Sequence, residues 1–347
     1  MDDNLRKKWM EAIHNDILSP LYFANIENFP YNENNPFRPN YTKVAELRMK
    51  DFSAFSYPKA ELREYILHIF YDLLEPFHIE ICKMQRFIYA VCENYQDNPF
   101  HNIFHAFSVL QMIHSIGEHV DKYQAYLDNR DRLALLISSY GHDLNHPGVT
   151  NAFMINSRHS LAIRYNDISV LENHHAATLV HFLELEGCDI FCNLPNEDQT
   201  YMRRLIIPTI LATDMARHKI VMENFAQTMQ NFNRENPTHR QHLLDMVLHS
   251  ADVGNPTYKF DLATVWSLRI IQEFNKQVLQ EEERGLPVSE FLRVGNEIKK
   301  IKQNQMGFID AVIYPLWKLL NTHIPQTQEY VESIERNRKM WEELEKL

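Results

Sequence analysis

The histidines of this chain gather in one stretch of the sequence, at spacings that suit metal binding. Ten of its 18 histidines fall between residues 101 and 181. His101 and His105 are four residues apart, as are His142 and His146, so on a helix the members of each pair share a face. Two imidazoles on one face can bind a metal ion together, or one can bind the metal while the other donates a proton. One isolated pair is more often a hydrogen-bonded core or surface pair, but several pairs with interleaved acids favour a metal site.

Two acidic residues come at the ends of apolar stretches that are typical of buried helices. Asp143 follows LLISSYGH and precedes a Pro-Gly turn, and Asp252 follows LLDMVLHSA and precedes Asn255-Pro256. A buried carboxylate is costly unless it meets a cation. The sequence therefore predicts that both acids share one metal centre. Asp214, in LATDMARH, fits either a third metal ligand or the N-cap of the next helix, and we favour the cap.

The elements that must position these residues are predicted to be α-helices. Only 8 of the 347 residues are glycine, about 2%, whereas the ordinary usage is about 7%. Chains with so little glycine lack the turns of sandwiches, barrels and phosphate-binding loops. Apolar residues at helical spacing begin near residue 58. Similar stretches cover residues 79–95, 102–116, 130–141, 174–186, 199–212, 216–230, 239–251, 262–283, 305–321 and 326–345. We expect an all-α fold.

Composition and missing motifs exclude several classes of protein. The formal net charge of −11 argues against non-specific binding of nucleic acid or anionic membranes. The sequence has no transmembrane run and no signal peptide, and its four cysteines form no CxxC pair, so we expect a cytoplasmic protein with reduced thiols. GxGxxG, GxxxxGK[ST], GxSxG and HExxH are also absent, which leaves Rossmann, P-loop, α/β-hydrolase and zincin chemistry without a motif.

Six motifs follow one another along the chain: NPFHNIFHA, GHDLNHPG, YNDISVLENHH, LATDMARH, HSADVGNP and QMGFID. Together they resemble the catalytic domain of the class I cyclic-nucleotide phosphodiesterases, which belong to the wider HD-domain metallohydrolases. The resemblance implies a compact all-α fold of about 14–16 helices. It covers residues 58–347 as a catalytic domain, and leaves residues 1–57 as a helical, Asn-rich arm that packs on or leads into that domain.

The resemblance implies a hydrolase that uses two divalent ions. By similarity, a first ion, zinc, is held by His105, His142, Asp143 and Asp252. Asp143 also bridges to a second ion, magnesium or manganese, which keeps mostly water ligands. A hydroxide between the two ions would attack the phosphorus of a 3′,5′-cyclic nucleotide, cAMP or cGMP, and release the 5′-monophosphate. The charge of the ions would let an acidic protein bind an anionic substrate.

The resemblance also implies roles for residues around the ions. His101 matches the general acid that protonates the leaving O3′, and Glu172 would orient it and keep it charged. The residues that would hold water or support the ligands from behind are His146, Thr213 and His175. The residues that would bind the base are Gln305, Phe308, Ile270 and Asn255.

The motifs disagree on which nucleotide is preferred. NPFHN, RYNDIS and LATDMARH are most similar to the type-nine, cGMP-selective subfamily, whereas Asn255-Pro256 is similar to the cAMP-selective subfamilies. Phe100 replaces a tyrosine of many relatives, as it does in type-nine enzymes. The amide of Gln305 can bond to either purine, so the way it is held decides the preference. Both nucleotides stay open.

Two other functions compete with this reading. A broader HD-type phosphohydrolase would act on linear nucleotides, but Gln305 and Phe308 lie three residues apart on a predicted helix, a spacing that suits a clamp for the base. A non-catalytic cyclic-nucleotide-binding module would have lost a metal ligand or the acid, and none is missing. The expected partners are therefore a cyclic nucleotide and two divalent ions, without nucleic acid, and a homodimer is left open.

Overall fold

The computed structural model describes residues 37–119 and 126–344 of the chain. Fifteen α-helices and no strand lie in these two ranges, which confirms the all-α expectation. The α-helices are α2 (Tyr41–Leu47), α3 (Lys59–Leu74), α4 (Ile81–Glu93), α5 (Ile103–His119), α7 (Asn129–Gly141), α8 (Asn151–Asn156), α9 (Ser160–Arg164), α10 (Val170–Glu184), α11 (Asn196–Leu211), α12 (His218–Gln230), α13 (Pro237–Asp252), α14 (Phe260–Glu283), α15 (Ile298–Phe308), α16 (Tyr314–His323) and α17 (Gln328–Glu343). Within the described ranges, none of the helices is long and apolar enough to cross a membrane.

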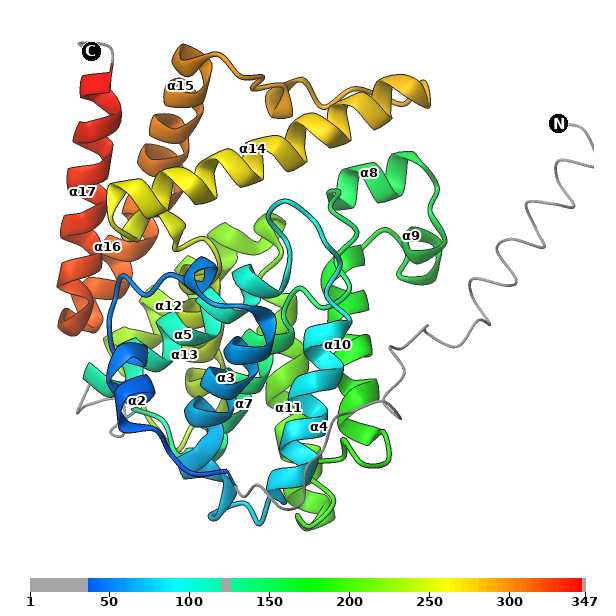
Figure 1. The fold of residues 1–347 in the computed structure, drawn as a ribbon, viewed down its shortest axis with the longest axis vertical. Helices are drawn as coiled ribbons and strands as arrows, with labels where there is room; N and C mark the ends of the chain where they lie inside the picture. The colour runs from blue at the N-terminus through cyan, green and yellow to red at the C-terminus, as the bar shows by residue number, and fades with distance from the viewer. Residues whose placement is uncertain (1–36, 120–125, 345–347) are drawn as a thin grey trace, which may run out of the picture.

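Helix α7 lies at the centre of the molecule and packs against α5, α11 and α13. Residues 133–141 of α7 are all buried. The two serines among them stay satisfied because Ser138 and Ser139 donate to the carbonyls of Ala134 and Leu136 in the same helix. In Figure 1, α14 crosses over the ends of the helices that surround α7, and α15 to α17 lie along one side. One end of the bundle is therefore covered by α14.

Capping residues set where the helices begin, and this places the site residues. The Asp128 side chain accepts from the backbone N–H of Asp131, whose own side chain accepts from the Asp128 N–H, so a capping box begins α7. Asn236 caps α13 through the N–H of Thr238. In the same way, Asn102 accepts from the N–H of His105 in the first turn of α5. His142 and Asp143 follow the C-terminal end of α7 and Asp252 ends α13, as predicted, and His105 lies in the first turn of α5.

The predicted helix over residues 305–321 is wrong in its bounds. Two helices, α15 and α16, cover this region, and a π-helical turn, Ile309–Ile313, joins them. Pro315, the second residue of α16, has no N–H to donate to the preceding turn, which favours a wider turn there. Two short helices, α8 and α9, were not predicted because five or six residues are too few for an apolar period to be recognised.

The expected N-terminal arm is described only from residue 37 onward, and residues 1–36 lie outside the described residues. From Tyr41 to Ser56 the chain packs on the helical bundle, where α2 contacts α3 and α5. Leu47 and Ala54 are buried in the main core. The side chain of Gln111 in α5 donates to the carbonyl of Leu47. This stretch therefore covers the core instead of leading away from it.

Candidate functional site

Four predicted metal ligands converge from three helices that are distant in the sequence. His105 comes from the first turn of α5, His142 and Asp143 directly follow α7, and Asp252 ends α13. One donor atom from each lies within 4.8 Å of the others. The Nε2 atoms of His105 and His142 are 3.0 Å and 3.1 Å from Asp252 Oδ1, and 3.4 Å and 3.3 Å from Asp143 Oδ2. Both imidazoles are fully buried.

This cluster fits a divalent metal ion. Asp143 Oδ2 is buried without a hydrogen-bond partner, and the two Nε2 atoms lie only 3.3 Å apart, facing the same carboxylates. Two nitrogens and two carboxylate oxygens are a donor set that zinc accepts. His142 Nδ1 lies 2.8 Å from the carbonyl oxygen of Ser139, which fixes the tautomer that leaves Nε2 for a metal.

The charges of the cluster agree with that fit. Burial would raise the pKa of the Asp143 carboxyl, but the charge of His142 and the close imidazoles of His105 and His142 hold this pKa well below its usual range. The pKa of Asp252 is lowered against burial by the same two histidines. Both carboxylates are therefore ionised, as metal ligands must be.

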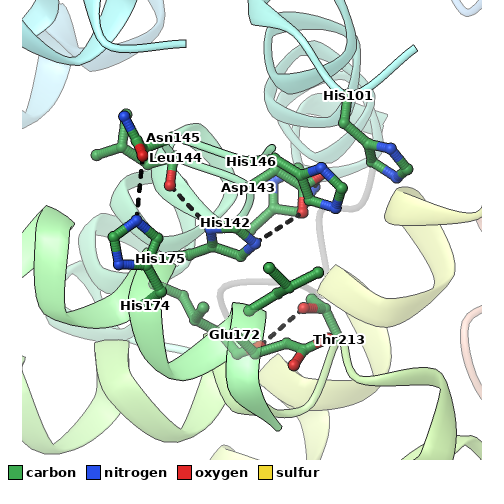
Figure 2. Close-up of polar contacts among 12 residues, drawn as sticks. His101, His142, Asp143, Leu144, Asn145, His146, Glu172, His174, His175 and Thr213 are labelled. Atoms are coloured by element: carbon green, nitrogen blue, oxygen red, sulfur yellow. Dashed lines mark hydrogen bonds and ion pairs between the residues drawn. The ribbon is translucent and has the colours of Figure 1, made fainter. Parts of the chain in front are cut away.

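A second group of possible ligands adjoins the first and shares Asp143. Donor atoms of Asp143, His146 and His175 lie within 4.8 Å of one another. His175 lies between the carbonyl of Leu144, 2.8 Å from its Nδ1, and Asp143 Oδ1, 3.7 Å from its Nε2 (Figure 2). Burial lowers the pKa of His175 to about 4, so this imidazole is neutral at pH 7 and can act as an acceptor or ligand.

The structure pairs His101 with Glu273 and not with the expected Glu172. His101 Nδ1 contacts Glu273 Oε1, and Glu273 Oε2 accepts from the backbone N–H groups of Phe100 and His101 at 2.9 Å and 3.1 Å. Burial opposes a charged His101, but the charge of Glu273 and its hydrogen bond raise the pKa of His101 to about 9. The pKa of Glu273 falls to about 2, mainly through His101 acting against burial.

Glu172 has other partners. Its two carboxylate oxygens accept from Asn151 Nδ2 at 3.2 Å and 2.9 Å. Burial, and after it the charge of Asp214, raise the pKa of Glu172 to about 7. The sequence could have indicated Glu273, because Ile270, Glu273 and Gln277 fall at i, i+3 and i+7 on α14 and therefore share one face of the helix. An acidic residue on the same face as Ile270 is a candidate for a buried carboxylate.

The remaining predicted residues around the ions line the same cavity, which has a volume of about 560 Å³. The ring of His146 stacks on His101 with centroids 4.0 Å apart, and its Nδ1 accepts from the N–H of Gly148. Thr213 donates to the carbonyl of Ile210. Figure 2 shows Thr213 and Glu172 on the side of the site opposite His101. Asp214 also lines the cavity and caps the short 3-10 helix Met215–Arg217, as we favoured.

The predicted base-binding residues lie in this cavity too. Its lining includes Gln305, Phe308, Ile270 and Asn255. The Gln305 amide has two neighbours that the sequence did not single out: Ser267 Oγ donates to its Oε1 at 2.7 Å, and its Nε2 donates to Asn304 Oδ1 at 3.1 Å. Ser267 and Asn304 could have been found only as polar residues within apolar helical faces. One cavity thus joins the metal-ligand cluster to an apolar slot with an amide at its edge.

Comparisons with known proteins place this chain in a family. A profile of the 3′5′-cyclic nucleotide phosphodiesterase family matches residues 100–334. The human protein named high affinity cGMP-specific 3′,5′-cyclic phosphodiesterase 9A is 33% identical over 319 residues, which are 90% of this chain and 53% of the human protein. The 3′,5′-cyclic-nucleotide phosphodiesterase regA of Dictyostelium discoideum is 35% identical over 298 residues, which are 84% of this chain and 37% of regA. The chain thus spans about half the length, or less, of these curated relatives.

A solved structure has the same fold. The phosphodiesterase domain of the RhoPDE fusion protein from the choanoflagellate Salpingoeca rosetta superposes with a TM-score of 0.82 at 34% identity, and the match covers 87% of this chain and 97% of that domain. The expected likeness to type-nine enzymes is confirmed by the relative from human. Because the family profile covers more than half of its residues, this chain belongs to the 3′,5′-cyclic nucleotide phosphodiesterase family.

Proposed function

We propose that this chain hydrolyses 3′,5′-cyclic nucleotides to nucleoside 5′-monophosphates. The observation that carries this proposal is a single cavity that holds both a four-ligand cluster around Asp143 and an apolar slot beside Gln305. The names of the relatives, a cGMP-specific phosphodiesterase in human and a cyclic-nucleotide phosphodiesterase in Dictyostelium discoideum, support the same reaction class.

The four clustered residues would hold the first ion, which we propose to be zinc, and are His105, His142, Asp143 and Asp252. Asp143 would also reach the second ion, magnesium or manganese, beside His146 and His175. When bound, such ions neutralise charge on phosphate oxygens and lower the pKa of water enough to supply a nucleophile at neutral pH. The chain's part is to fix these ligands at buried helix ends, where the positions of their donor atoms are constrained.

His101 would act as the general acid. Its Nδ1 is held by Glu273, so the proton at Nε2 is the one available to the leaving O3′. With its pKa raised to about 9, the imidazole is protonated at neutral pH and can give this proton as the bond to phosphorus breaks. Glu273 would keep the ring charged and oriented, the role that the family resemblance implied for Glu172.

Glu172 and Thr213 would position water on the side of the site away from His101, and His146 and His175 would do so beside Asp143. Glu172 and Thr213 line the cavity on that side. With a pKa near 7, Glu172 can either donate or accept a hydrogen bond at neutral pH. A hard, hydrated cation is held largely through such water contacts.

The base would lie between Phe308 and Ile270, with its edge against Gln305 and Asn255 nearby. Both described partners of Gln305 can act as donor or as acceptor. The hydroxyl of Ser267 can donate to the carbonyl of Ala263 instead and then accept from Gln305, and the Asn304 amide carries both a donor and an acceptor. Both orientations of the Gln305 amide therefore find hydrogen-bond partners. We therefore propose that both cAMP and cGMP are substrates.

The test is to incubate the purified chain with Zn²⁺ and Mg²⁺ and to measure 5′-monophosphate released from cAMP and from cGMP. Release from at least one supports the hydrolase, and comparable kcat/KM values for both support the dual preference. An Asp72→Asn variant, changed on the exposed face of α3, is a matched control for a charge loss elsewhere. Hydrolysis of linear nucleotides alone would favour the broader phosphohydrolase. Binding of cyclic nucleotide without turnover would favour the non-catalytic module.

Three broader proposals accompany this function. The catalytic domain spans residues 58–347, with the preceding segment packed on it as far as residue 41. The chain acts in the cytoplasm, for which the four free cysteines are support. The third is a homodimer, which the sequence leaves open: light scattering after size-exclusion chromatography would test it, and a monomer mass of about 41.3 kDa would contradict it.

A further inference from the structure

The segment that leads into α10 is held in a costly backbone conformation. Asn166, Asp167 and Ser169 have φ angles of 55°, 61° and 42°, in the left-handed region that side chains other than glycine rarely adopt. Such strain persists only where the surrounding structure determines it, and it collects at functional sites. This segment belongs to the YNDIS part, residues 165–169, of the motif YNDISVLENHH, and the proposed reaction gives this part no role.

Ser169 precedes α10 but does not cap it. A serine at this position ordinarily accepts from an N–H group of the first helical turn, yet the Ser169 side chain makes no such bond. Asn151 takes that place, because its Oδ1 accepts from the N–H of Leu171 at 2.9 Å. The Ser169 hydroxyl is left to donate to Asp214 Oδ2 at 2.7 Å. The side chain of this strained residue therefore binds a carboxylate that lies 45 residues further along the chain.

The carboxylate of Asp214 is held at both oxygens. Oδ2 accepts from Ser169, and Oδ1 accepts from the N–H of Ala216. The side chain is largely buried, yet it lines the cavity next to Thr213. Asp143, Glu172 and Asp214 all line this cavity.

We propose that Ser169 is a positioning residue. Its hydroxyl would hold the Asp214 carboxylate in a fixed orientation, so that this negatively charged group faces the water ligands of the hydrated divalent cation in the second site. The inference rests on the proposed two-ion function. Magnesium and manganese keep several waters when bound, so a fixed acceptor beyond the direct ligands holds those waters in place. A carboxylate that turns freely would lose this effect while keeping its charge.

The experiment is a calorimetric titration of the zinc-loaded full chain with Mn²⁺, without nucleotide. Partners outside the direct ligands typically change metal affinity by about 10–100-fold, and we expect Ser169→Ala to weaken Mn²⁺ binding by about tenfold with an unchanged zinc content. Ser169→Gly also lacks the hydroxyl but accepts the left-handed backbone, so it should lose the same affinity without losing stability. Asp214→Asn keeps an acceptor and loses the charge, and should weaken Mn²⁺ binding at least as much.

Ser157→Ala is the matched control, because that hydroxyl donates only to the nearby carbonyl of Met154, and its Mn²⁺ affinity should not change. Unchanged Mn²⁺ affinity in Ser169→Gly would overturn the inference even if Ser169→Ala fails to fold. Weakened binding in Asp214→Asn alone would also overturn the role of Ser169. A parent chain that binds no Mn²⁺ would overturn both this inference and the second cation site, whereas hydrolysis measured separately tests the proposed reaction.

Discussion

The Nδ1 atom of His101 contacts the Oε1 atom of Glu273, a carboxylate that lies 172 residues further along the chain. The second oxygen of Glu273 accepts from the backbone N–H of His101, so the acid holds both the ring and the main chain of its partner. A buried carboxylate with three hydrogen bonds is strongly stabilised in its ionised form. This contact gives α14 a role in the proposed proton transfer as well as in base binding.

Glu273→Gln should lower the pH at which activity is lost. His101 must be protonated to act as an acid, and its pKa is raised to about 9, so activity should fall as the pH rises through that value. Without the charge of Glu273, the pKa of His101 should move toward its ordinary value of about 6.5, and turnover at pH 8 should fall at least about tenfold. The measurement is kcat/KM against pH, with the exposed Glu75→Gln as control. An unchanged basic limb would contradict the role of Glu273.

His101→Ala should lower turnover without removing metal. The imidazole is not among the four clustered ligand candidates, and its loss removes proton donation, which is worth about 10²–10⁴ in rate. Metal analysis of the purified variant should find the zinc content of the parent chain. A variant that has lost its zinc would instead make His101 part of the metal site.

Asp143→Ala should abolish activity through the loss of both ions. Asp143 is the one residue that belongs to both the four-ligand group and the group with His146 and His175. Metal content by mass spectrometry should fall for both ions, while Asp72→Asn keeps both. Full occupancy of both sites in Asp143→Ala would refute the bridging role.

Gln305→Leu should weaken the use of both nucleotides. Leucine has a similar size but cannot bond to the purine edge, and an unpaired buried polar group costs about 1–3 kcal/mol. We expect kcat/KM for cAMP and cGMP to fall about tenfold to hundredfold. Gln272→Leu, on the exposed face of α14, should leave both values unchanged. Equal effects of the two substitutions would remove Gln305 from base recognition.

Gly141→Ala should destabilise the fold. An added Cβ at Gly141, the last residue of α7, would lie 2.6 Å from Cδ1 of the buried Leu179 in α10. Such overpacking typically costs about 1–3 kcal/mol of unfolding free energy. Gly117→Ala in α5 meets nothing within 4 Å and should instead gain up to about 1 kcal/mol from helix propensity. Urea unfolding of both variants checks this contrast.

Much of the fold follows from local patterns. Capping residues such as Asp128 and Asn236, and apolar spacing in between, mark where α7 and α13 begin, because both signals act within one or two turns of the chain. The π-helical turn at Ile309–Ile313 was not predicted, because the apolar stripe of the helix continues through it. Helices as short as α9 leave no period to recognise.

In the site, the sequence alone predicted a metal centre, because imidazoles and acids at helix ends have the types and spacing of metal ligands, and the family resemblance implied which four residues would hold the ion. Only the tertiary structure decided the pairings: Glu273 beside His101, Ser267 beside Gln305, and Ser169 beside Asp214. Each of these contacts joins elements that are far apart in the chain. Their geometry depends on how whole helices pack, a property that no local run of residues encodes.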